Sequence, residues 1–174
     1  GLRAEYLHFD YQNKMLDGRS KDDGTACDMG GCRYSRPGDR SDSFNNTSTQ
    51  LGWIHNFDEY SQTFINLSHA FRAPQASELY RLQNSQLVAD LNSEQIDSFE
   101  LGFRGNFKRG NISAALFFMN KDNVIFQNSD RENVSDGKTQ HKGLELHGNL
   151  VMTPSLGLKV AASYALHTYE ENIA

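Results

Sequence analysis

Hydrophobic and polar side chains alternate with a period of two along several stretches of the chain. Residues 96–107 give the clearest example, because Phe99, Leu101 and Phe103 share one face while Ser98, Glu100, Gly102 and Arg104 share the other. Successive side chains of a β-strand point to opposite faces, so this pattern predicts an amphipathic strand. Residues 140–152 and 156–168 alternate in the same way and predict two more long strands.

Four further stretches have strand character: residues 2–14, 47–56, 60–71 and 111–127. The last carries apolar side chains on both faces, so its pattern does not decide which face looks inward. The predicted fold is therefore all-β, with about seven antiparallel strands in an up-and-down meander. Strands of 12 residues or more exceed the usual length in globular sheets and suit a tilted crossing of a bilayer.

The connections between these strands alternate between short and long. Residues 57–59, 108–110 and 153–155 read as tight turns, whereas residues 15–46, 72–94 and 128–139 read as long loops rich in Asp, Asn, Ser, Gly and Arg. Outer-membrane barrels have short periplasmic turns at one end and long extracellular loops at the other, and soluble sandwiches do not alternate so strictly. The pattern favours a partial transmembrane barrel with short turns at one end and long loops at the other.

Composition agrees with this prediction and argues against other classes of protein. The 174 residues include 17 Lys and Arg against 22 Asp and Glu, for a formal charge of −5, and 37% are hydrophobic. No apolar run approaches the roughly 20 residues of a spanning helix, and the scattered basic residues argue against nucleic-acid binding. Large polar groups on the strands, such as Glu100, Arg104, Glu145 and Lys159, suit a water-filled lumen, with lipid against the apolar faces.

The two cysteines lie close together, in Cys27-Asp-Met-Gly-Gly-Cys32. Four intervening residues with a Gly pair let the chain double back, so we expect a disulfide and hence an oxidising compartment. A metal pair is the alternative, but two thiolates supply only half of a tetrahedral site.

The stretch from Asn66 to Pro74, which contains Phe-Arg-Ala-Pro, is followed by Glu78-Leu79-Tyr80 and resembles a motif region of TonB-dependent outer-membrane receptors. Ser98-x-Glu100-x-Gly102 and Gly143-x-Glu145 resemble the same family. The resemblance implies a segment of a barrel of about 22 strands in the outer membrane of a Gram-negative cell. It also implies import of a scarce ligand, such as a ferric siderophore or other metal chelate, powered through TonB. Residues 1–174 are then barrel wall, and we expect the plug, the TonB-contacting segment and the final strands to lie outside them.

Ligand capture on this segment would fall to the long loops and the upper lumen. The candidates are Arg and Tyr residues, since Arg forks onto carboxylate or catecholate oxygens and Tyr offers a rigid ring with a polar tip. The set is Arg33, Tyr34, Arg36, Arg72, Tyr80 and Arg81. An equally good interpretation is that these residues hold the loops to one another.

Other chemistry is weakly supported. Aligning Gly24 with the sixth position of a calcium-binding EF-hand loop puts Arg19 and Lys21 where acidic ligands belong. His141 and His147 share a face but lie about 20 Å apart along a strand, and the other histidines are isolated in sequence. Ser163, His167 and Asn149 have the residue types of a barrel hydrolase, without a nucleophile motif. We therefore expect no enzyme activity, cofactor or resident metal.

An opposing hypothesis is a secreted all-β module that binds carbohydrate or protein. In that protein a second sheet would cover the apolar strand faces, and a compact monomer would form without detergent. For the receptor segment we expect contact with outer-membrane lipid, an extracellular ligand, TonB through segments outside this chain, and self-association of the isolated segment through its unpaired edges.

Overall fold

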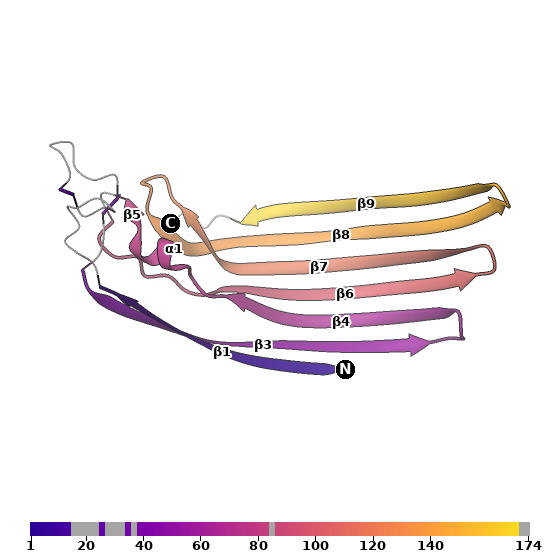
Figure 1. Ribbon diagram of the computed structural model, residues 1–174, viewed down its shortest axis with the longest axis horizontal. Helices are drawn as coiled ribbons and strands as arrows, with labels where there is room; N and C mark the ends of the chain where they lie inside the picture. Colours follow the sequence, from indigo (N-terminus) through magenta and orange to yellow (C-terminus); the bar gives the residue numbers. More distant parts are fainter. Residues whose placement is uncertain (15–24, 27–33, 36–37, 84–85, 171–174) are drawn as a thin grey trace.

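The computed structural model describes residues 1–14, 25–26, 34–35, 38–83 and 86–170. Its main feature is one antiparallel seven-stranded sheet in the order β1-β3-β4-β6-β7-β8-β9 (Figure 1). Each strand pairs with the next long strand along the chain, which confirms the up-and-down meander. The strands are β1 (Leu2–Asn13), β3 (Arg40–Asn56), β4 (Ser61–Arg72), β6 (Glu94–Phe107), β7 (Gly110–Gln127), β8 (Asn133–Thr153) and β9 (Leu156–Glu170).

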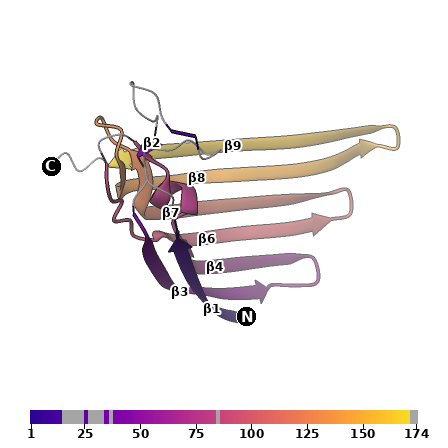
Figure 2. The ribbon, with the colours of Figure 1, turned by 60° about the vertical axis from the view of Figure 1, so that its left-hand side comes forward.

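Three short elements complete the described structure. The helix α1 (Ala76–Tyr80) and the strand β5 (Leu82–Gln83) lie in the connection between β4 and β6, and β5 pairs with β2 (Tyr34–Ser35). Both α1 and β5 sit at the end of the sheet opposite the tight turns (Figures 1 and 2). Within the described ranges, no helix has the length and apolar character needed to cross a membrane.

The tight turns fall where the sequence predicts them. In the turn between β3 and β4, the Asp58 carboxylate accepts hydrogen bonds from the Tyr60 backbone N–H at 2.7 Å and the Ser61 hydroxyl at 2.8 Å. These two bonds lower the pKa of Asp58. An Asx turn of this kind replaces backbone ladder bonds where the chain reverses.

The third long loop is much shorter than the sequence predicts. Strands β7 and β8 leave only residues 128–132 between them, and β3 likewise begins at Arg40 rather than at Thr47. Register shifts interrupt the β7–β8 ladder beyond Lys121, where Asn123 has a positive φ of 55°. These strand extensions lack apolar alternation, because polar side chains occupy both faces, and they therefore resemble loop in sequence.

One face of the sheet carries a continuous apolar band. Cross-strand neighbours place Ile65, Leu101 and Leu116 in one row, and Leu67, Phe99 and Phe118 in the next. The side chains of Phe99, Leu101 and Leu144 are 39%, 38% and 44% exposed, so no second layer of described residues covers this face. The covering sheet that a soluble module requires is not present in these parts of the chain.

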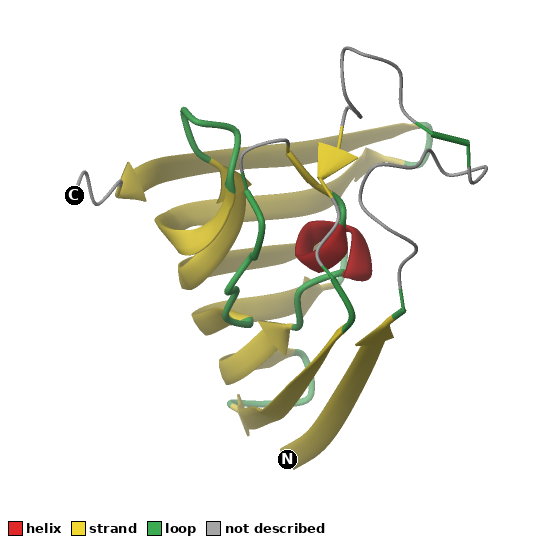
Figure 3. Cartoon of the chain, turned by 90° about the vertical axis from the view of Figure 1, so that its left-hand side faces the viewer, coloured by secondary structure: helices red, strands yellow, loops and turns green. Residues whose placement is uncertain are grey.

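The opposite face carries mostly polar side chains. It lies on the concave side of the curved sheet, where α1 sits (Figure 3). On it Asn66 donates to Glu100 at 3.0 Å, and the Ser68 and Ser98 hydroxyls share a hydrogen bond of 2.6 Å. We call this the lumen face. Pairing with β6 also decides the open question about β7: Leu116 and Phe118 join the apolar band, whereas Phe117 and Met119 lie on the lumen face.

An aromatic ring fills the space beside a glycine on the lumen face. A Cβ at Gly102 would lie 2.0 Å from Cζ of Phe64, whose side chain is 6% exposed. The Arg104 guanidinium lies over the same ring, 4.6 Å from its centroid, a cation–π contact. Gly102 is thus required by the packing of its cross-strand neighbour.

Candidate functional site

The residues with functional potential gather at the long-loop end of the sheet, in residues 73–93 between β4 and β6. This segment, which we call the inner loop, carries α1 toward the lumen face (Figure 3). Pro74 stops β4, because proline has no N–H for the ladder. The Glu78 carboxylate then accepts the Gln75 backbone N–H at 2.7 Å and caps the first turn of the short helix.

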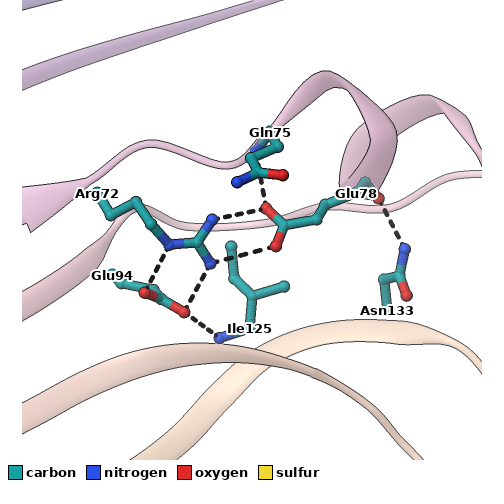
Figure 4. A network of polar contacts seen from close by, with 6 residues as sticks. All are labelled: Arg72, Gln75, Glu78, Glu94, Ile125 and Asn133. Atoms are coloured by element: carbon teal, nitrogen blue, oxygen red, sulfur yellow. Dashed lines mark hydrogen bonds and ion pairs between the residues drawn. The ribbon is translucent and has the colours of Figure 1, made fainter.

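Arg72 is the junction between this loop and the sheet. Its guanidinium donates to Glu94 at 2.7 Å through Nε and at 2.8 Å through Nη2, and to Glu78 at 3.0 Å through Nη1 and 3.2 Å through Nη2 (Figure 4). Glu94 opens β6 and Glu78 lies in α1, so one cation fastens both sides of the loop. Bidentate pairs of this type are among the stronger hydrogen bonds in proteins.

The network continues into the neighbouring hairpin. Glu94 Oε1 also accepts the Ile125 backbone N–H at 2.9 Å, and Asn133 donates to the Glu78 backbone carbonyl at 2.9 Å. The hydrogen bond from Arg72 is the main reason that the pKa of Glu94 lies below its usual value, and the same bond raises the pKa of Arg72. Both groups are therefore charged at neutral pH.

A small buried cluster lies under the loop. Leu79, Tyr80, Leu82, Ala89 and Leu91 are its buried members, and Tyr11, Phe44 and Ile125 from the sheet pack against it. Burial of these side chains is the main apolar contribution to holding the loop in place. The most buried apolar side chains of the described residues thus lie at the loop end, and in the described part of the seven-stranded sheet Phe64 is the one buried apolar side chain.

Polar contacts fix the orientation of this cluster. The Tyr80 hydroxyl donates to Asp42 Oδ2 at 2.7 Å, and Asp42 also pairs with Arg40, whose guanidinium reaches the Ala89 carbonyl at 3.3 Å. Burial, followed by the bond to Asp42, raises the pKa of Tyr80 to about 12. Asp42 and Arg40 belong to β3, whereas Glu94 belongs to β6. The loop is therefore held by the strands on both sides of β4.

A second set of hydrogen bonds ties the loop to β8. The buried Gln86 side chain donates to the Asn133 carbonyl at 2.9 Å and accepts the Asn133 N–H at 2.8 Å, as a paired strand would do. Ser135 accepts the Asn92 N–H at 2.8 Å. The next two residues after Gln86, Leu87 and Val88, are instead 73% and 59% exposed. They form an apolar tip on an otherwise anchored loop.

The sequence-predicted ligand residues divide into three groups. Arg72 and Tyr80 are brought together in the anchoring contacts above, whereas Arg81 is exposed at the end of α1. Backbone pairing places Tyr34 opposite Gln83, close in the chain to Arg81. Arg33 and Arg36 lie outside the described residues, as do Cys27 and Cys32, so the disulfide stays a prediction.

Sequence reasoning missed one pair on the lumen face. His141 lies beside His167, which is isolated in sequence, and not beside His147: the Nδ1 atoms of His141 and His167 are 2.6 Å apart across β8 and β9. The tight turn between β8 and β9 makes this pair predictable. In a hairpin the residue numbers of paired positions have a constant sum, so the register that pairs Glu145 with Ser163 also pairs His141 with His167. Among the residues that the structure describes, no group of three or more His, Cys, Asp and Glu could hold a metal ion.

Comparisons with known proteins match this architecture. The family model described as TonB dependent receptor-like, beta-barrel, matches residues 1–174. An uncharacterized TonB-dependent receptor of Haemophilus influenzae is 33% identical over 120 residues, an alignment that covers 66% of this chain and 32% of that protein. The chain therefore spans about a third of the length of this relative.

Solved structures share the fold at low sequence identity. The ferric-catecholate import receptor Fiu of E. coli has a TM-score of 0.63 and 20% identity, with 98% of this chain and 25% of that chain covered. The FrpB iron transporter of Neisseria meningitidis has a TM-score of 0.63 and 19% identity, covering 78% and 22%. The copper transporter OprC has a TM-score of 0.64 and 15% identity, covering 80% and 23%. The chain belongs to the TonB-dependent receptor family, as part of its β-barrel, and is an outer-membrane protein of a Gram-negative bacterium.

Proposed function

We propose that this chain forms part of the wall of a receptor that imports a metal chelate, such as a ferric siderophore, in a TonB-dependent manner. The observation that carries the proposal is the inner loop, which is anchored on the lumen face by Arg72 and by the small buried cluster under the loop. A loop held in this way projects a defined surface over the bore of the barrel. The shared fold of Fiu, a ferric-catecholate import receptor, and of FrpB, an iron transporter, supports the ligand class.

The exposed part of this loop supplies the proposed ligand surface. Leu87 and Val88 offer apolar contact to an aromatic chelating group, and Arg81 offers a guanidinium to its anionic oxygens. Arg33, Tyr34 and Arg36 remain proposed partners of the same surface, because β2 pairs with β5 beside Arg81. Arg72 and Tyr80 are proposed to act on the ligand indirectly, since their polar groups hold the loop.

The test uses the complete receptor in outer membranes and a ⁵⁵Fe-loaded tricatecholate siderophore as the probe. We expect uptake that stops when TonB is deleted, and an uptake affinity that falls when Arg81→Ala or Leu87→Asp is introduced. Lys108→Ala, in the turn at the opposite end of the sheet, is the matched control and should leave affinity unchanged. Absence of ⁵⁵Fe uptake, or uptake that persists without TonB, would overturn the proposal.

A further inference from the structure

Two histidines face each other on the lumen face, away from the inner loop contacts. His141 in β8 and His167 in β9 are directly opposite in the antiparallel register, with ring centroids 4.9 Å apart and ring planes at 64°. Their Nδ1 atoms are 2.6 Å apart. His141 is half-buried and His167 is exposed, so a solute in the lumen can reach both rings.

A neighbouring hydroxyl orients the first ring. His141 Nε2 lies 3.0 Å from Thr139 Oγ1. When Nε2–H donates to this hydroxyl, Nδ1 of His141 carries the lone pair, and the bond between the rings uses the Nδ1–H of His167. Fixing one ring nitrogen through a hydrogen bond is how proteins present the other nitrogen to a metal ion.

A methionine extends the row. Met119 in β7 is the cross-strand partner of His141 on its other side, so the lumen face reads Met119, His141, His167 across three adjacent strands. Directly opposite side chains have Cβ atoms about 4.5–5.5 Å apart, which brings a thioether within reach of the imidazole. Imidazole suits copper, and copper(II) binds nitrogen ligands most tightly among the divalent first-row metals, whereas a thioether is only a weak, long ligand of copper(II).

The charged neighbours of the row are few. Lys121 lies on the same face one row further along β7, opposite Thr139, and its positive charge opposes cation binding, an effect that an anionic ligand on the metal would offset. Glu145 faces the lumen on β8 four residues from His141, about 13 Å along the strand, which is too far for it to join the same ion.

We propose that His141 and His167 form a transition-metal site on the lumen wall, with copper(II) as the preferred ion and Met119 beside it. Two imidazole nitrogens at right angles on one metal are about 2.9 Å apart, given bond lengths of about 2.0–2.1 Å. The Nδ1 atoms need to separate by only a few tenths of an ångström from their 2.6 Å contact, and the rings must turn so that both Nδ1 lone pairs point at the metal. The metal replaces the shared proton, which moves to Nε2 of His167, and water or a ligand of the metal fills the remaining positions.

The test measures copper(II) binding to the complete purified receptor in detergent at neutral pH, by competition with a chelator and by electron paramagnetic resonance. We expect the wild-type spectrum to contain a copper species with two nitrogen ligands, and His141→Asn or His167→Asn to remove that species and weaken binding at least about tenfold. Met119→Leu should shift the spectrum while leaving both nitrogens. His147→Asn is the matched control, since His147 lies on the same face of β8 with Ala161 opposite, and should change nothing.

Equal copper affinity and identical spectra in the wild type, His141→Asn and His167→Asn variants would overturn the site. Circular dichroism and heat-modifiable mobility of each variant establish that the barrel is intact, so that a loss of binding is not a loss of fold. The measurement requires no transport and no siderophore. Failure of copper binding is thereby distinguishable from failure of the proposed chelate uptake.

Discussion

Replacing Arg72 by Met should release the inner loop while leaving the barrel folded. Met keeps much of the aliphatic length of Arg but removes all four hydrogen bonds to Glu78 and Glu94. The two carboxylates, which share the one guanidinium, would then face each other without a cation. The backbone N–H of Ile125 would still bind Glu94, and the buried cluster under the loop would remain.

The size of the effect follows from the exposure of the three side chains. Hydrogen bonds to charged groups contribute about 1.5–3 kcal/mol each when well buried, whereas exposed ion pairs contribute about 0–1 kcal/mol. The side chains of Arg72, Glu78 and Glu94 are 36%, 24% and 14% exposed, between these limits. Water replaces part of what is lost, so we expect the opening free energy of the loop to fall by about 2–3 kcal/mol, or roughly 30- to 160-fold in the opening equilibrium.

Hydrogen exchange by mass spectrometry on the complete receptor measures this quantity directly. Peptides covering residues 76–91 should exchange roughly 30- to 160-fold faster in the Arg72→Met variant, because their amides exchange through local opening. Peptides from the membrane-spanning part of β6 and β7 should be unaffected. Arg109→Met, in a tight turn at the other end of the sheet, is the control for removing one arginine.

A change of less than threefold in residues 76–91 would refute the reasoning, and would mean that the apolar cluster alone holds the loop. A uniform increase across the sheet strands would also refute it, because the loss would then be global instead of local.

Three further predictions follow from the fold. Lowering the pH should loosen the inner loop only in the acid range: the pKa of Glu94 is below its usual 4.5, so its stabilising contribution is complete above that value and is lost as the pH falls through the lower, folded-state pKa. Hydrogen exchange corrected for intrinsic rates should therefore be flat from pH 7 to about 5 and rise below about 4.5, and a rise centred near neutrality would contradict the assignment. Leu101→Arg should destabilise the receptor in lipid by about 2–4 kcal/mol in denaturant unfolding, whereas Ser163→Arg on the lumen face should cost much less. Gly102→Ala should cost about 1–3 kcal/mol through its clash with Phe64 and should be relieved when combined with Phe64→Ala, so additive effects in this double-mutant cycle would exclude the steric explanation.

The membrane-spanning wall was predictable because each of its faces meets one kind of environment. Lipid on one side and water on the other impose strict alternation, and Phe99, Leu101, Leu144 and Leu166 record it in the sequence. The extensions at residues 40–46 and 133–139 were not predictable in this way, because the inner loop covers one of their faces through polar side chains such as Asp42 and Ser135. Polar residues buried by hydrogen bonds leave no periodic pattern of hydrophobic residues.

The sequence predicted some of the residues of the candidate site, but not the role that each of them has. Arg72 and Tyr80 were selected for chemistry that could bind a ligand, and their contacts with Glu94 and Asp42 depend on residues 22 and 38 positions away. The alternative that such residues pin loops to one another describes these contacts. The His141–His167 pair was accessible from the short turn that sets the register, whereas Met119 joins it across a longer connection with register shifts.

The anchoring of residues 73–93 has a consequence for how receptors of this kind can diversify. The described ties from this loop to the long strands run to Arg40 and Asp42 in β3, Arg72 in β4, Asn123 in β7, and Asn133 and Ser135 in β8. The tip at Leu87 and Val88 lies outside those ties. New side chains at these two positions should therefore change what the outer surface recognises without a cost to assembly, which makes the tip a natural place to graft an altered selectivity onto an unchanged frame.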